Sequence, residues 1–295
     1  MNNSFNEDSQ LVDTMLFIFS KIKEVSIIVF LVTTLSVIFY IFLTNEKYTS
    51  TSVLQKTSYS PNNQNNTSSL SSLGQLAGLT MGASDENSEK IIVKRIQTRE
   101  FFDKLVSIHN DYPSIIFAAL SYEKGSNRIV FDNNIYDSDK SKWVKNINNQ
   151  DIHEEFLDNL SIKFNLDDNL IYMTYEHASP YFAREIISSI TNLYNQEYMK
   201  KSLKESTEAI DLLMIEIANS VDPIIKNNIA SLVQNHYQQK MFASIKPALS
   251  FIEPPYVPDN KSSPGFVFYT LLGILLGIVI GCIYVLLFSN NKRYN

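Results

Sequence analysis

Long uncharged apolar stretches lie near both ends of the chain, and a more polar sequence of mixed pattern separates them. The first stretch is 25–43 and the second is 265–288, which makes them 19 and 24 residues long. A helix rises about 1.5 Å per residue, so either stretch is long enough to cross a hydrocarbon layer of roughly 30 Å. The pattern therefore predicts two membrane-spanning helices rather than buried helices of a soluble protein.

The flanking sequences indicate how these spans are oriented. A mostly polar segment precedes the first span, which favours a retained anchor over a cleaved signal peptide. Basic residues lie outside the two spans, at Lys21, Lys23, Lys292 and Arg293, and this bias places both termini in the cytoplasm. The expected organisation is a cytoplasmic head (1–24), a first span (25–43), an outward domain (44–264), a second span (265–288) and a cytoplasmic tail (289–295).

The outward domain mixes strand and helix patterns. Alternating positions predict a strand over 46–56, a hairpin over 159–177 with its turn at 167–169, and a last strand over 247–255. Helical spacing predicts a single amphipathic helix over 88–109 and two long helices over 180–219 and 223–245. The segment 57–69 is a polar loop of low complexity, and 110–150 shows no clear pattern.

These elements predict an α+β fold between two transmembrane helices. The first and last strands of the outward domain lie next to the spans in sequence, so we expect them to pair in one membrane-proximal mixed sheet. The helices over about 180–245 contain no glycine, and each begins at a proline that follows a capping residue. We expect them to project from the sheet as a long helix or helical hairpin, whose apolar stripe packs on another helix or another subunit.

Charge and composition exclude several classes of function. The formal net charge is −6, which argues against a nucleic-acid-binding face. The one cysteine, Cys282, lies within the second span, so no disulfide forms within the chain and the outward domain suits a bacterial periplasm. The four histidines show no metal-binding spacing, and Asp167 and Asp168 are better explained as a turn than as catalytic carboxylates. We predict no catalytic residue, no metal and no cofactor, and therefore no enzyme.

A proline-rich connector precedes the second span. Prolines fix φ and remove backbone donors, so this segment is expected to be extended and stiff. Such a connector would couple the position of the outward domain to that of the span, whereas the alternative is a simple spacer that stops a helix. The prolines concerned are Pro254, Pro255, Pro258 and Pro264.

Three glycines follow at helical spacing in the second span. Gly273, Gly277 and Gly281 lie on one helix face, four residues apart. In lipid, small residues at this spacing let helices approach closely. The glycines are candidates for packing against the first span, a neighbouring subunit or a partner membrane protein.

The order of these motifs resembles the polysaccharide co-polymerases, chain-length determinants of the Wzz type. The resemblance covers essentially the whole chain, and no single motif carries it. The segments that carry it are "DSQLVDTMLFIFSKIK" before the first span, "EKYTSTSVLQ" after it, "EKIIVKRIQTREFFDKLV" with its core at Thr98–Phe101, the proline-rich "EPPYVPDNKSSPGF" and the glycine-containing "GILLGIVIG". The chain has no GxxxxGK[ST] phosphate loop and no tyrosine-rich tail, so it resembles the branch of the family without a kinase domain.

The resemblance implies a non-enzymatic regulator in the bacterial inner membrane. Such a protein forms a homo-oligomer in membrane lipid and sets the modal length of a surface polysaccharide, such as lipopolysaccharide O antigen, together with a separate polymerase. The lipid-linked growing glycan is a further expected partner, and Arg99, Glu100 and Phe101 are candidate subunit or partner contacts. The alternative is an export adaptor that bridges to an outer-membrane channel, but such adaptors usually have one span and lack the proline signature.

Overall fold

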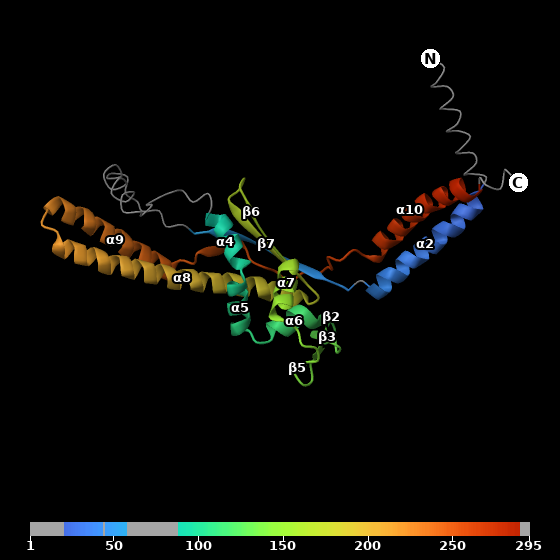
Figure 1. Ribbon diagram of the computed structural model, residues 1–295, viewed down its shortest axis with the longest axis horizontal. Coiled ribbons are helices and arrows are strands. Elements are labelled where there is room, and N and C mark those ends of the chain that lie inside the picture. The colour runs from blue at the N-terminus through green and yellow to red at the C-terminus, as the bar shows by residue number, and fades with distance from the viewer. Residues whose placement is uncertain (1–20, 44, 58–87, 290–295) are drawn as a thin grey trace, which may run out of the picture. The chain divides into compact units, whose positions relative to one another are not determined.

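The computed structural model describes residues 21–43, 45–57 and 88–289, and these form two compact units with boundaries after Glu46 and after Lys261 (Figure 1). One unit holds the two terminal apolar helices, and the other is the central part of the chain. The head expected over 1–24 falls mostly, and the polar loop over 57–69 almost entirely, outside the described residues.

The central unit contains a four-stranded sheet. Its order is β6-β7-β1-β8, and the pairing of β1 with β8 was expected from their positions in the sequence. The α+β fold class is confirmed, but the sheet is antiparallel throughout rather than mixed. A tight turn joins β6 to β7, and β1 and β8 run in opposite directions as the chain enters and leaves the unit. The strands are β1 (Tyr48–Lys56), β6 (Leu160–Asn165), β7 (Leu170–His177) and β8 (Leu249–Glu253).

The turn between β6 and β7 lies where the sequence predicts it. Asn169 adopts a left-handed φ of 57°, which asparagine tolerates better than most residues. The Asp168 carboxylate accepts a hydrogen bond from the Leu170 backbone N–H at 3.0 Å. Polar turn residues thus fix the register that places alternate β7 side chains in the core.

Two long helices follow the hairpin, as predicted. The 40-residue α8 (Pro180–Asn219) begins after the N-cap Ser179, and α9 (Pro223–Ile245) begins after the N-cap Asp222. The first half of α8 packs on β1 and β7, and α9 runs back along the second half of α8 (Figure 1). A small apolar cluster of Ile210, Ile229 and Val233 joins the two helices.

The main core lies between the sheet and the surrounding helices. Alternate residues of β1 and β7 face it, because side chains of a strand point to opposite faces in turn. Aromatic rings fill much of the space, with Phe102 against Phe156 and Tyr112 against Phe182. The largest fully buried side chains are Tyr112, Tyr175, Phe101, Phe102, Phe156, Leu54, Ile96, Leu105, Ile171, Met173, Ile186 and Ile187.

The prediction of a single helix over 88–109 is wrong. The structure divides it into α4 (Ser88–Ile96) and α5 (Arg99–Ile108). Thr98 causes the break, because its hydroxyl donates to the Arg95 carbonyl at 2.7 Å and accepts from the Phe101 N–H at 3.3 Å. This side chain ends one helix and caps the next.

The segment without a clear sequence pattern folds into short elements. Helix α6 (Tyr112–Ala118) leads into a β2–β3 hairpin, and a second, smaller hairpin β4–β5 follows before helix α7. These strands are short, so their patterns are too brief to read from the sequence. Their bounds are β2 (Ala119–Glu123), β3 (Arg128–Phe131), β4 (Tyr136–Asp137), β5 (Lys142–Trp143) and α7 (Asn149–Asn159).

The terminal unit consists of two apolar helices. They are α2 (Ile22–Leu43) and α10 (Phe266–Tyr284), and a π-helical turn, Val285–Ser289, continues α10. Within the described residues, each is long and apolar enough to cross a membrane. Their outward side chains are largely exposed apolar groups, as a lipid-facing surface requires.

Candidate functional site

The three predicted glycines lie in the contact between α10 and α2. A Cβ added at Gly277 would lie 2.8 Å from the Val29 Cα, and one at Gly273 would lie 2.9 Å from the Thr33 Cα. At Gly281 the nearest atom is the Val25 Cγ1, at 3.0 Å. The glycines therefore let the two backbones approach at successive turns, and they pack against the first apolar helix of the same chain.

Polar and aromatic groups reinforce this helix pair. The Ser36 hydroxyl donates to the Tyr269 carbonyl at 2.8 Å. Tyr40 packs against Tyr269 at 5.3 Å and edge-on against Phe266 at 6.1 Å between ring centroids. A hydrogen bond between helices and a cluster of rings add specific contacts to the close packing of the glycines.

The proline-rich connector is held against the sheet. The buried Ser50 of β1 donates its hydroxyl hydrogen bond to the Tyr256 carbonyl at 2.7 Å. Pro258 is buried, Pro255 is half-buried, and Pro254 and Pro264 are exposed. The extended segment after β8 is therefore attached to the strand by which the chain enters the central unit.

The three residues expected to contact a subunit or partner have different surroundings. Arg99 and Glu100 lie on the surface of α5, and each forms an ion pair one turn along the helix, with Asp103 and Lys104. Hydrogen bonding to Lys104 lowers the pKa of Glu100. Phe101 is 1% exposed, so it belongs to the core and the expectation of a contact role for it is wrong. The turn that starts at Thr98 directs its ring inward.

An ion-pair network ties both parts of the broken helix to α8. Glu197 of α8 accepts from Arg95 of α4 at 3.2 Å and from Lys104 of α5 at 2.6 Å. Bonding to Glu100 and Glu197 raises the pKa of Lys104. The sequence analysis missed Glu197, because its partners lie about a hundred positions away in the chain.

A buried histidine joins β7 to the start of α8. The Nδ1 of His177 accepts from the Ser179 backbone N–H at 3.0 Å, so its Nε2 carries the proton and donates to the Ile115 carbonyl at 3.0 Å. Burial lowers the pKa of His177 to about 4. The ring therefore acts as a neutral structural group that positions the N-cap Ser179.

The outer half of the helical hairpin exposes many apolar side chains. They lie on both helices and in the turn between them, and Val221 at that turn is 93% exposed. The second half of α8 packs on α9, and many apolar side chains of the two helices stay exposed among the residues that the structure describes. The exposed residues are Leu212, Met214, Ile215, Val221, Ile224, Ile225, Tyr237, Met241 and Ile245.

No protein-family model matches the chain, and no curated protein matches it. Among solved structures, a full-length bacterial polysaccharide co-polymerase has a TM-score of 0.41 at 16% identity, covering 96% of this chain and 99% of that one. A fragment of WzzB, a polysaccharide co-polymerase from Salmonella Typhimurium, has a TM-score of 0.31 at 13% identity, covering 74% and 100%. The chain is similar in structure to polysaccharide co-polymerases. At these identities, the choice of functional residues rests on the contacts of the chain itself.

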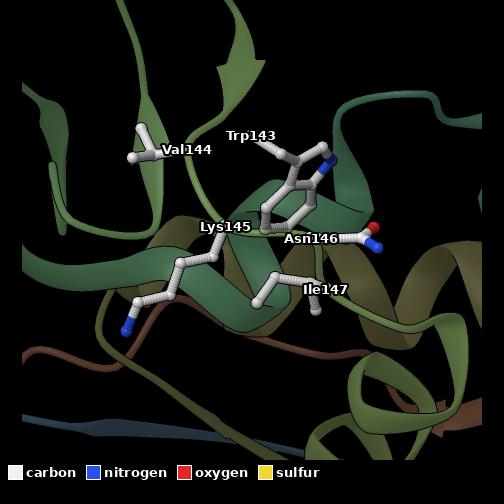
Figure 2. A pocket seen from close by; sticks show the side chains of 5 residues that line it. All are labelled: Trp143, Val144, Lys145, Asn146 and Ile147. Carbon is white, nitrogen blue, oxygen red and sulfur yellow. The ribbon is translucent and has the colours of Figure 1, made fainter.

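One surface feature was missed by the sequence analysis. Trp143 and the four residues after it line a hollow of about 370 Å³ beside the β4–β5 hairpin (Figure 2). Trp143 is the one tryptophan of the chain, and it lies among successive exposed residues. Its rarity was the signal available in the sequence.

Among the described residues, no group of three or more His, Cys, Asp or Glu side chains is arranged to hold a metal ion.

Proposed function

We propose that this chain is a non-enzymatic regulator that sets the modal length of a bacterial surface polysaccharide, such as lipopolysaccharide O antigen. The observation that carries the proposal is the pairing of β1 with β8, the strands that follow and precede the two apolar helices. In the order of the sequence, the central unit thus lies between two apolar helices that pack on each other through a glycine face. This arrangement accompanies ordered sequence motifs that resemble the polysaccharide co-polymerases.

The proposed topology has two spans in the inner membrane, cytoplasmic termini and a periplasmic central unit. The length and apolar surface of α2 and α10 support the spans. The basic residues Lys21 and Lys23 before the first span, and Lys292 and Arg293 after the second, support the orientation. Two spans also require both termini to lie on the same side.

The proposed assembly is a homo-oligomer that acts as a scaffold for a polysaccharide polymerase. The exposed apolar residues of the α8–α9 hairpin support it, because contiguous apolar surface of this kind marks interaction sites. The polymerase in the same membrane and the lipid-linked growing glycan are the proposed partners. The surrounding lipid contacts the outer faces of α2 and α10.

The test is a gel profile of surface polysaccharide from a strain that lacks the chain, beside one in which it is restored. We expect the clustered bands to become an unregulated distribution of short chains, and to return on restoration. An unchanged distribution would refute the proposal. If polymer of unchanged length is instead trapped in the periplasm, an export adaptor is the better account.

A further inference from the structure

Trp143 is a partly exposed aromatic side chain on the short β4–β5 hairpin. Trp143 is 37% exposed. Its ring meets Tyr136 edge-on at 5.3 Å and 70°, and Phe117 at 6.4 Å and 64°, between ring centroids. Tyr136 is itself supported by Phe131 at 5.3 Å. The indole is therefore held in place from behind while part of its surface faces solvent.

The backbone around Trp143 is also fixed. Tyr136 and Trp143 are paired residues of β4 and β5. The Val144 N–H donates to the Ile135 carbonyl at 2.9 Å, and Ile147 packs against the main core. The hollow is thus formed by a loop that is anchored at both ends rather than by a free segment.

The lining of the hollow combines apolar and hydrogen-bonding groups. In Figure 2 the Trp143 indole and the Asn146 amide project to the same side of the view, while Lys145 extends in the opposite direction, and all three line the hollow. Asn146 is exposed, and its amide supplies both a donor and an acceptor. Val144 and Ile147 complete the hollow.

This set of groups matches the chemistry of a sugar ring. The carbon-bound hydrogens of a pyranose form an apolar face with partial positive charge, which packs on the negative face of an aromatic ring. The hydroxyl groups at the edge of the sugar both donate and accept hydrogen bonds, which an amide satisfies in one contact. An open hollow that is lined by one aromatic ring and few polar groups suits one residue of a chain that continues into solvent.

We propose that Trp143 and Asn146 form a subsite for one sugar residue of the polysaccharide whose length the protein regulates. This inference rests on the proposed function, which supplies the class of ligand. Trp143 stacks on the sugar ring, and Asn146 bonds its hydroxyl groups. The subsite lets the central unit contact the growing polymer directly.

The experiment uses the full chain in detergent micelles. The probe is a set of oligosaccharides of one to four repeat units, prepared from the surface polysaccharide of a strain that carries this chain. Because Trp143 is the one tryptophan, emission that is excited at wavelengths where tyrosine absorbs little reports this site. We expect a saturable change in emission with the oligosaccharides and none with dextran oligomers of the same size.

Variants test the assignment by titration calorimetry, which does not depend on the indole. We expect Trp143→Ala to weaken oligosaccharide binding about tenfold or more, and Asn146→Ala to weaken it about fivefold. Tyr181→Ala removes an exposed aromatic residue at the start of α8, and should leave the affinity unchanged. Circular dichroism confirms that each variant is folded.

Two results would overturn the proposal of a subsite. One is that emission does not change at high oligosaccharide concentration, and the other is that the folded Trp143→Ala variant binds the oligosaccharides as tightly as the unmodified chain. Gel profiles separate this failure from failure of the proposed function. If deletion of the chain alters the length distribution but Trp143→Ala does not, the regulator stands and the subsite falls. If deletion alters nothing, the proposed function falls, and the titration still decides whether the hollow binds sugar.

Discussion

At the scale of single residues, two buried tyrosines show how a hydroxyl group is satisfied or left alone. The Tyr112 hydroxyl donates to Glu185 at 3.2 Å and shares a hydrogen bond with Ser189 at 2.8 Å. The Tyr175 hydroxyl is buried without a partner among the described residues. Burial raises the pKa of both groups. A buried polar group without a hydrogen bond costs free energy, so the hydroxyl groups of Tyr112 and Tyr175 contribute differently to the stability of the fold.

These tyrosines give opposite predictions for the same substitution. Tyr112→Phe should lower the free energy of unfolding by about 1 kcal/mol, because it removes the hydroxyl that is hydrogen-bonded to Glu185 and Ser189 and leaves these two groups without that partner. Tyr175→Phe should leave it unchanged or raise it, because it removes an unpaired hydroxyl. Urea unfolding followed by circular dichroism compares the two. Equal destabilisation by both variants would show that Tyr175 has a hydrogen-bond partner.

The buried His177 should make the folded protein less stable in acid. Its pKa is about 4 in the folded state, below the ordinary 6.5, so the unfolded chain binds the proton more readily. The stabilisation is complete above pH 6.5 and is lost as the pH falls toward 4. It amounts to roughly 3 kcal/mol over the whole window. Protonation at Nδ1 would also remove the acceptor of the Ser179 N–H.

The measurement is the midpoint of urea unfolding between pH 5 and pH 7. We expect a shallower pH dependence in His177→Gln than in the unmodified chain. Burial also lowers the pKa of His236, which is only half-buried, so His236→Gln is the comparison and should flatten the slope less than His177→Gln does. An identical slope in the unmodified chain and in His177→Gln would rule out His177 as the titrating group.

At the scale of elements, the sequence predicted those whose pattern is long enough to read. The β6–β7 hairpin alternates over many residues, and α8 and α9 have prolines and caps at their starts, so these were found. Thr98 was missed as a helix break because threonine occurs within helices, and its capping contacts appear only in three dimensions. The two-residue strands β4 and β5 are held by contacts among Phe117, Tyr136 and Trp143, which no local pattern encodes.

The packing of α10 on α2 depends on the absence of a side chain at Gly277. Gly277→Ala should loosen the pair, although alanine favours a helix by about 1 kcal/mol, because the new Cβ meets the Val29 backbone at 2.8 Å. Hydrogen exchange of the α10 amides, measured in lipid nanodiscs, should become faster. Gly265→Ala is the control, since no heavy atom lies within 4 Å of its Cβ position. Equal exchange in both variants would contradict close packing.

The ion-pair network predicts a salt-dependent contribution to stability. Glu197→Gln should lower the free energy of unfolding by about 1 kcal/mol or less, because water surrounds Arg95 and Lys104 in part. The difference from the unmodified chain should shrink in 1 M NaCl. Lys201→Gln, which breaks an exposed pair with Glu205, should change little at either salt concentration. A Glu197→Gln effect that persists in high salt would indicate lost packing instead.

At the scale of the whole molecule, the candidate site was predicted in part. The glycine face and the proline segment were recognisable because their residue types act through the backbone, which the sequence reports directly. A contact role for Phe101 was expected from the motif at Thr98–Phe101, although its place among the apolar positions of the helix already pointed to the core, where it is 1% exposed. Consecutive residues line the Trp143 hollow, but the rings of Phe117 and Tyr136 that hold the indole come from other elements, so only the rarity of tryptophan could have indicated it.

The exposed apolar hairpin predicts assembly through α8 and α9. Ile215→Glu places a charge among exposed apolar groups, and should reduce the mass of the particle measured by light scattering in detergent. Glu216→Lys changes the charge of an adjacent exposed residue and should leave the mass unchanged. If Ile215→Glu keeps the mass of the unmodified chain, the subunits associate through another surface.

The turn at Val221 lies at the free end of the hairpin, far along the sequence from the junctions of α8 with β7 and of α9 with β8. Matched insertions in α8 and α9 near this turn would lengthen the hairpin by about 5.4 Å for each added turn of both helices. The sheet, the connector and the apolar helix pair would keep their contacts. Hairpin length is thus a property that evolution or a designer can adjust independently, in whole helical turns, while the rest of the protein is reused.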